Sequence, residues 1–511
     1  MNYNAAELRQ KLDEEIAGLG RRLQTLRAQR NRLAPIYRLP IETMSHIFLS
    51  AYNGIHTRQP LTLSSVSREW RELALDLPEL WSRIDGDLKL EHIPAYMARS
   101  RRKPLQVFLD NLDPNHTSTI STILREFPRM QAMAISGSPA EDLLSGSSPL
   151  WKIKAPILEK LSIERFSIRR SMFSGCVPLL SQLILTDCHF TWNSLPAFPQ
   201  LKSLSIIRPQ DKIALKDFLQ RLHSMPLLDH VQTADALTGT LTDPSLFQLP
   251  NLTSIQLEAE NCGIVAEMLQ ALVLPRIHRL ILRLEDSDPQ DQLAILDALN
   301  QRTSFVTSPV RLLNVKARED YCGYAIEGEL ISAELQFNYT PPTEDDIYQF
   351  LLRFNLKNLQ DLRLDFANIE EVEGDDPILW ELLGESVGLQ RIVVRNIPVG
   401  SLATYLSAEN GKFDVLLNYL SHLFEEKWTS LPQLTELIIL RPEQCSCVDA
   451  ENLRAISQYL SIRQECGHEL ESLTVASQHP LPKALKNALR NSVGQFYLPT
   501  HDIKTDMDDL F

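Results

Sequence analysis

The sequence predicts an α/β chain in which an N-terminal helix and a small helical module precede an irregular solenoid. Three observations predict this architecture. Apolar residues recur every seven positions near the N-terminus, residues 39–81 carry two short amphipathic helices, and the pattern L-x-x-L-x-L recurs from residue 130 to residue 475. These features divide the chain into a helix (1–36), a module (37–84), a connecting region with the first solenoid units (85–126), the solenoid (127–480) and a C-terminal helix with an acidic tail (481–511).

Composition excludes several classes of protein. The chain has 511 residues, of which 44% are hydrophobic and 23% charged, as in ordinary globular proteins. Its net charge of −14 argues against a nucleic-acid partner, because such proteins carry a basic surface. No apolar run approaches 18 residues, the N-terminus lacks a signal-peptide pattern, and the seven cysteines are scattered. We therefore expect a cytoplasmic or nuclear protein with reduced thiols and no membrane contact.

Residues 5–34 are predicted to form one helix with a short coiled-coil seam. The apolar positions of the seam are Leu12, Ile16, Leu19, Leu23, Leu26 and Leu33. Arg30 interrupts the seam, and Gly18 and Gly20 each weaken the helix by up to about 1 kcal/mol relative to alanine. Two alternatives remain open. The seam pairs with a second copy of the chain, or it packs back on the rest of the protein.

The module is the stretch around which the chain is organised. It reads LPIETMSHIFLSAYNGIHTRQPLTLSSVSREWRELALDLPELW. Apolar residues at helical spacing predict one helix from Ile41 and a second through Trp70, and Pro78 ends the second helix. A unit of roughly 45 residues buries little apolar surface, so it usually depends on a partner or a neighbouring domain.

At these residues the stretch resembles the F-box, the helical module that docks on the Skp adaptor of Skp–cullin ubiquitin ligases. The match runs from Leu-Pro at residue 39 through Ile-Phe at 47 and Ser-Arg at 67 to Leu-Trp at 80. The resemblance implies binding to a Skp adaptor, and through it to a cullin ligase. The implied anchors are Leu39, Pro40, Ile47, Phe48, Leu63, Val66 and Trp70. Some of these face the module's own core, and the sequence does not divide them between core and partner.

The segment after the module carries a second, softer resemblance. HIPAYMARSRRKPLQVFLD predicts a helix over 93–100 and a strand from Leu105. Its layout is similar to the segment that follows the F-box in mushroom-type fungal F-box proteins.

The repeats predict thirteen short strands. Their paired apolar positions are Met133/Ile135, Leu161/Ile163, Leu183/Leu185, Leu204/Ile206, Val231/Thr233, Ile255/Leu257, Leu280/Leu282, Leu313/Val315, Ala333/Leu335, Leu362/Leu364, Ile392/Val394, Leu437/Ile439 and Leu473/Val475. Helical or irregular returns between them, such as 212–222, 290–299 and 345–354, make neighbouring strands parallel. No unit buries its apolar face alone, so stacking produces one continuous core.

This pattern resembles leucine-rich repeats, with the strands on the concave face of a solenoid. The usual Asn or Cys after each strand is nearly absent, with Cys188 as the clear case, which predicts an irregular solenoid with breaks near 301–310 and 396–430. An ordinary open α/β sheet is the alternative, although thirteen strands would make it unusually wide. Outward residues between the paired apolar positions are the candidate substrate contacts: Ile184, Ser205, Gln256, Ile281, Arg363 and Val393.

Motifs for catalysis are missing from the sequence. There is no nucleophile elbow, phosphate-binding loop, dinucleotide fingerprint or zinc-protease motif. Cys445, Cys447, Cys466 and His468 are too closely spaced within pairs for a usual zinc site, and we interpret them as ordinary side chains. We therefore expect no enzyme activity, no metal and no cofactor.

Two functions remain open. The first is a substrate-recognition adaptor whose F-box binds the Skp adaptor and whose solenoid binds an unknown protein substrate. The alternative is a ligase-independent scaffold that uses the module only to cap the solenoid.

Overall fold

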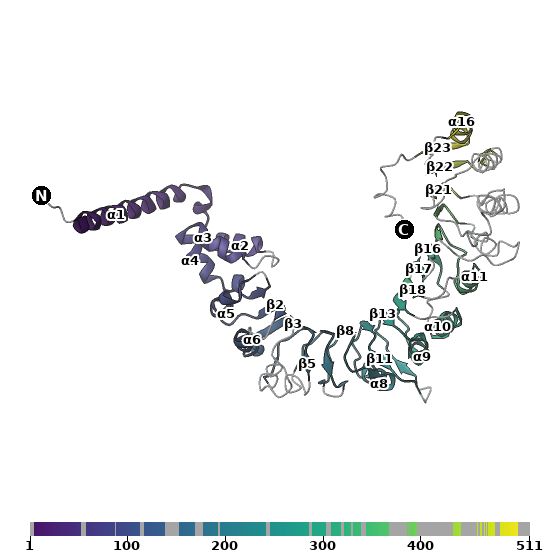
Figure 1. Cartoon of the computed structure of the whole chain (residues 1–511), viewed down its shortest axis with the longest axis horizontal. Coiled ribbons are helices and arrows are strands. Elements are labelled where there is room, and N and C mark those ends of the chain that lie inside the picture. The colour runs from purple at the N-terminus through teal and green to yellow at the C-terminus, as the bar shows by residue number, and fades with distance from the viewer. Residues whose placement is uncertain are drawn as a thin grey trace. The chain divides into compact units, whose positions relative to one another are not determined.

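The structure is a computed structural model of the whole chain (Figure 1). It describes residues 5–52, 58–86, 88–112, 117–137, 153–168, 177–192, 195–241, 246–285, 289–302, 308–317, 321–328, 331–338, 344–366, 386, 388–395, 433–440, 457, 460–461, 464, 467, 469–475 and 481–498. Contacts divide the chain into two compact units, 1–198 and 199–511. Each unit is described by itself.

Helices dominate the start of the first unit. They are α1 (Ala5–Arg32), α2 (Ile41–Ala51), α3 (Gln59–Val66) and α4 (Arg68–Asp76), with short 3-10 helices at Pro35–Arg38 (η1) and Pro78–Trp81 (η2). Proline occupies the first or second position of η1, α3 and η2, where its missing N–H costs no hydrogen bond. The predicted helices are therefore present, but the module contains α3 in addition to the two helices predicted for it.

A parallel sheet follows these helices in the first unit. Its strands pair in the order β1 (Arg83–Asp85), β2 (Leu105–Leu112), β3 (Met130–Gly137), β4 (Lys160–Glu164) and β6 (Gln182–Thr186). Helices α5 (Ile93–Arg99) and α6 (Thr117–Leu124) make the first two connections. The register places one row of buried residues across all five strands: Ile84, Val107, Met133, Leu161 and Leu183. The module therefore supplies the first strand of this sheet.

The described residues of the second unit contain a sheet of twelve strands. Five parallel strands come first: β8 (Ser203–Ile207), β10 (His230–Ala234), β13 (Ser254–Ala259), β15 (Arg279–Leu284) and β18 (Ser332–Asn338). Then follow β17 (Tyr321–Gly328), β16 (Val310–Ala317), β19 (Asp361–Phe366), β20 (Arg391–Arg395), β21 (Glu436–Leu440), β22 (Leu470–Val475) and β23 (Val493–Tyr497).

Helices cover one side of these strands. They are α8 (Leu215–His223), α9 (Cys262–Ala271), α10 (Pro289–Arg302) and α11 (Glu344–Leu351), and α16 (Lys483–Asn491) precedes the last strand. Figure 1 shows α8 to α11 following one another along the strands, and each helix contacts the next. Helices thus fill the returns predicted at 212–222, 290–299 and 345–354.

The prediction that neighbouring strands are all parallel is wrong at one place. A strand occurs at every predicted position, but β17 was not predicted, and it runs antiparallel between β18 and β16. Cys322, Tyr324 and Ile326 alternate on β17 and are buried, with the Tyr324 ring stacked 3.9 Å from that of Phe350. Strand β17 lacks the repeat pattern, so its alternating apolar residues were not recognised as a strand between the two predicted neighbours. The resulting three-stranded meander interrupts the parallel order.

The turns after the strands are connected by main-chain hydrogen bonds in place of a repeated asparagine side chain. Arg165, Asp187, Arg208 and Asp235 directly follow β4, β6, β8 and β10, and each has a positive φ between 43° and 63°. Three of these residues donate their N–H groups to the end of the next strand: Arg165 to Thr186 O (2.9 Å), Arg208 to Ala234 O (2.7 Å) and Asp235 to Glu258 O (2.9 Å). Main-chain hydrogen bonds therefore join successive turns. Buried Cys188 adds a thiol hydrogen bond to Ile163 O at 3.3 Å.

Several predicted features lie outside the described residues. They are the break at 396–430, the four residues Cys445, Cys447, Cys466 and His468, and the acidic tail from His501. Among the described residues, no helix is long and apolar enough to cross a bilayer.

Candidate partner-binding surface of the module

The module has a small core formed between α2, α4 and η2. Met44 and Phe48 of α2, Leu73 and Ala74 of α4, and Leu80 and Trp81 of η2 are buried. The rings of Phe48 and Trp70 lie 4.8 Å apart at 57°, and this aromatic contact joins α2 to α4. The core therefore fixes the relative orientation of the two helices.

The bend between α3 and α4 is held by polar contacts. Ser67 is the N-cap of α4, and its Oγ accepts a hydrogen bond from the N–H of Trp70 at 3.1 Å. Arg71 Nε donates to the carbonyl of Ser64 at 2.9 Å. Because Ser67 is extended (φ −154°, ψ 173°), α3 ends and α4 begins in a new direction at this residue.

A set of apolar residues remains exposed outside this core, and we call it the apolar surface of the module. It consists of Leu39 (39% exposed), Ile41 (64%), Ile47 (38%) and Val66 (50%), together with exposed Pro40. They come from the segment before α2, from α2 itself and from the end of α3. Most apolar side chains in a small module are needed for its core, so five left outside it point to a partner.

The structure divides the seven predicted anchors into three groups. Leu39, Pro40, Ile47 and Val66 belong to the apolar surface, Leu63 and Trp70 are half-buried, and Phe48 is 1% exposed. Phe48 is thus a core residue that supports the surface. Ile41 was not among the predicted anchors, although it is 64% exposed. Its position in the first helical turn, three residues before buried Met44, is the only sequence signal for it.

The far end of the module is joined to the sheet of the first unit. Trp81 Nε1 donates to Ala74 O at 2.7 Å, its ring lies 4.9 Å from that of Tyr96, and the Arg99 guanidinium sits 4.4 Å above it. Burial raises the pKa of the Tyr96 hydroxyl above its usual value. These contacts and the pairing of β1 with β2 make the module continuous with the sheet.

Ion pairs reinforce the same junction. Lys103 Nζ lies 2.6 Å from Glu79 Oε1, and this hydrogen bond lowers the pKa of the Glu79 carboxyl. Arg101 pairs with Asp76 at 2.8 Å. Burial raises the pKa of Tyr52 to about 12, so the phenol stays protonated at neutral pH.

The predicted substrate contacts are distributed over both units. Ile184 lies half-buried on β6 of the first unit. In the second unit, the register joins Ser205, Gln232, Gln256 and Ile281 in one row across β8, β10, β13 and β15. Gln232 was missed because its repeat is weak, although it stands between the paired apolar positions like the others. Gln256 and Ile281 are half-buried and reach the surface.

Two of these predictions need correction with respect to accessibility. Ser205 is 3% exposed, and its Oγ donates to Gln232 Oε1 at 2.8 Å, so the longer side chain of the next strand covers it. Val393 is fully buried beside Arg363 in the register of β19 and β20. Arg363 itself is held 2.7 Å from Asp361, and this ion pair raises the pKa of the guanidinium.

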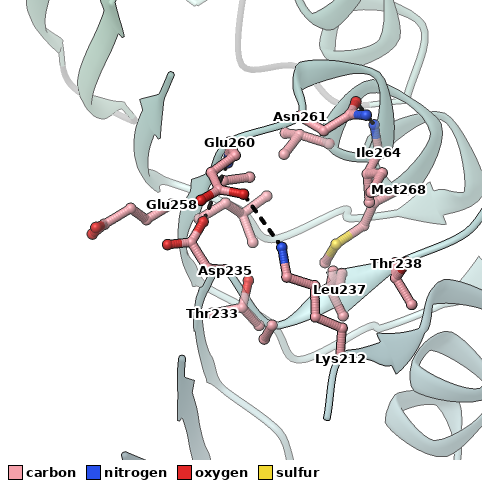
Figure 2. Close-up of a pocket in the computed structure, with 14 residues that line it drawn as sticks. Lys212, Thr233, Asp235, Leu237, Thr238, Glu258, Glu260, Asn261, Ile264 and Met268 are labelled. Carbon is pink, nitrogen blue, oxygen red and sulfur yellow. Dashed lines mark hydrogen bonds and ion pairs between the residues drawn. The ribbon is translucent and has the colours of Figure 1, made fainter. Parts of the chain in front are cut away.

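A pocket of about 250 Å³ lies at the carboxyl ends of β10 and β13 (Figure 2). Lys212 Nζ lies 3.4 Å from Glu260 Oε2, and the N–H of Glu260 donates to Asp235 Oδ1 at 3.2 Å. Asn261 caps α9 by accepting from the N–H of Ile264 at 3.4 Å. The interactions marked by dashed lines in Figure 2 thus join the turns that follow these strands. In the described part of the chain, no group of three or more His, Cys, Asp or Glu side chains is placed to hold a metal.

Comparison with known families identifies the module. Residues 36–86 match the model of the F-box-like family, which covers about a tenth of the chain. The chain therefore contains an F-box-like domain, and domains of this family generally bind Skp-type adaptors. The matched range covers α2, α3, α4, η2 and β1 and includes the entire apolar surface. No curated protein shows significant similarity to this chain.

Proposed function

We propose that this chain is the substrate-recognition subunit of a Skp–cullin–F-box ubiquitin ligase. The observation that carries the proposal is the apolar surface, which lies within the F-box-like match. Fully burying an aliphatic side chain stabilises by about 1.5–3 kcal/mol, so covering several of these residues would supply most of the binding energy. The proposed partner is a Skp-type adaptor, because F-box-like domains generally bind such adaptors.

The rest of the chain would present the substrate. We propose that the strands and helical returns form a leucine-rich-repeat-like solenoid whose strand face carries the substrate-binding residues. Support comes from the parallel register, the strands at every predicted repeat and the turns joined by main-chain hydrogen bonds. The accessible candidates on this face are half-buried Ile184, Gln256, Ile281 and Arg363. The similarity to mushroom-type fungal F-box proteins remains a prediction.

The proposed mechanism is proximity. The chain would make and break no covalent bond itself, and would hold a target lysine near a ubiquitin-charged enzyme. This raises the effective concentration of the two reactants. The proposed role belongs to the cytoplasm or the nucleus, where cullin ligases act.

One observation favours the alternative function. Strand β1 of the module pairs with β2 and extends the parallel sheet, so the module covers the end of the sheet in the way a terminal capping element does. In a ligase-independent scaffold, capping the sheet would be the only function of the module. The two functions differ in whether the apolar surface binds an adaptor.

The test is co-purification of the full chain with a Skp-type adaptor. Ile47→Asp and Val66→Asp place a charge on the apolar surface, and Ser65→Asp is the matched control on an exposed position of α3, about 100° around the helix from Val66. We expect the wild type and Ser65→Asp to recover the adaptor and the other two variants to lose it. Circular dichroism must show that all four proteins remain folded. No adaptor recovery by the folded wild type would reject the ligase role and favour the scaffold.

A further inference from the structure

Helix α1 presents an apolar seam with nothing packed on it among the described residues. Leu12, Ile16, Leu19, Leu23 and Leu26 are each between 48% and 66% exposed. The helix has 28 residues and is therefore about 42 Å long. An apolar stripe of this length on an exposed helix needs a cover.

The contacts between α1 and α4 lie away from this seam. Gln24 Oε1 accepts from the Arg68 guanidinium at 3.3 Å, and Arg32 Nε lies 3.3 Å from Glu69 Oε1. With Leu12 and Leu19 at position d and Ile16 and Leu23 at position a, Gln24 falls at b and Arg32 at c. The module thus holds α1 from the side opposite the a/d seam. The seam does not pack back on the module, and a second helix can reach it.

The two halves of α1 carry opposite charges. Its first half contains four acids and two bases and is therefore net negative: Glu7, Asp13, Glu14 and Glu15 against Arg9 and Lys11. Its second half contains five arginines and no acid: Arg21, Arg22, Arg27, Arg30 and Arg32. In a parallel pair, Arg22 at position g would face Arg27 at position e of the other helix, and Arg30 would face its own copy. An antiparallel pair instead brings the acidic half of each helix against the basic half of the other.

We propose that α1 is a homodimerisation element that pairs with α1 of a second copy in antiparallel orientation. One register aligns residues 5–30 of both helices. It places Ile16 against Leu19 and Leu23 against Leu12 of the other copy, each contact occurring twice. In the same register Glu15 faces Arg22, both at position g, again twice. A cationic partner would meet the basic half unfavourably and an anionic partner the acidic half, whereas a second copy complements both.

The pairing goes beyond adaptor binding and does not depend on it. Two copies joined at α1 would carry two F-box-like domains in one assembly. A substrate with two recognition sites would then bind with increased avidity.

The oligomeric state of the full chain tests the pairing. Light scattering over a concentration series should give a mass of twice 58.2 kDa at the upper end. Ile16→Glu/Leu23→Glu should be monomeric, and the matched control Ala17→Glu/Thr25→Glu, on exposed positions b and c, should remain dimeric. A monomeric wild type, or a dimeric seam variant, would overturn the proposal. Circular dichroism verifies that the variants are folded.

A single charge reversal tests the orientation. In the antiparallel pair, Arg22→Glu meets Glu15 twice and should weaken dimerisation about tenfold in Kd, and adding Glu15→Arg should restore it. In a parallel pair the same Arg22→Glu would face Arg27 and tighten the dimer. Tightening overturns the antiparallel arrangement, and an unchanged Kd overturns the register. Sedimentation velocity measures the dimer Kd of the wild type, the single variant and the double variant. No adaptor is present, so the result does not depend on whether the chain acts in a ligase.

Discussion

The rings of Phe48 of α2 and Trp70 of α4 lie 4.8 Å apart, tilted by 57°, in the F-box-like domain. Ile47, the residue before Phe48, is 38% exposed on the outer side of the same helix. Because successive residues of a helix point about 100° apart, Phe48 faces the core while Ile47 faces the surface. Substitutions at these two positions should therefore have different consequences.

Phe48→Ala should lower the free energy of unfolding of the domain by about 3–5 kcal/mol, because it removes a buried ring and leaves a cavity. Ile47→Ala should lower it by less than about 1 kcal/mol, because the side chain is already partly in water. Urea unfolding followed by tryptophan fluorescence measures both. Equal losses for the two variants would contradict the assignment of Phe48 to the core and Ile47 to the surface.

Ser67→Ala should destabilise α4 by about 1 kcal/mol, since it removes the oxygen that accepts the Trp70 N–H. Ser67→Asp should retain most of the stability, because its carboxylate caps the same N–H and complements the helix dipole. The urea midpoints of the two variants provide the comparison. If Ser67→Asp lost as much stability as Ser67→Ala, the cap would not be the reason for serine at this position.

Cys188 should be unreactive in the folded chain. Burial raises the pKa of its thiol to about 11, so almost no thiolate forms at pH 8. Treatment with iodoacetamide at that pH, followed by digestion and mass spectrometry, should leave Cys188 unmodified. The same treatment in urea is the control and should modify it fully. Rapid alkylation without urea would show that the turn after β6 is open.

His230 should make the second unit less stable in mild acid. Burial, with a contribution from Arg279, lowers the pKa of its imidazole below 6.5 in the folded chain. The unfolded chain then binds a proton first as pH falls, so stability drops below about pH 6.5 and is retained above it. Urea midpoints at pH 7.5 and 5.5 should differ less for His230→Gln than for the wild type. An identical pH dependence would show that the imidazole titrates normally.

Arg165 has a φ of 63° in the turn after β4. Arg165→Gly should be neutral or slightly stabilising, because glycine adopts this conformation without strain. Arg165→Val should cost about 1–2 kcal/mol, because a β-branched side chain clashes with the backbone there. Thermal unfolding of both variants tests the turn geometry. Similar melting temperatures would indicate that the turn rearranges.

Short stretches of the sequence are enough to predict most of the helices and strands of this protein. The spacing of apolar residues in each repeat determines which side of a strand is buried, and every predicted strand is present for that reason. The order of residues between 39 and 84 likewise determined the F-box-like domain, because its helices start and stop at their own prolines and at Ser67. These features depend on neighbours within a few residues.

Only the tertiary structure decided how residues of one type divide between core and surface. Phe48 and Ile47 read alike as apolar anchors, but Phe48 is buried and contacts the ring of Trp70, 22 residues away in the sequence, whereas Ile47 is exposed. Gln232 covers Ser205, and β17 enters between β18 and β16, through contacts between distant segments. Local pattern specifies the elements of this protein, whereas burial and strand order follow from packing partners that lie far apart in the chain.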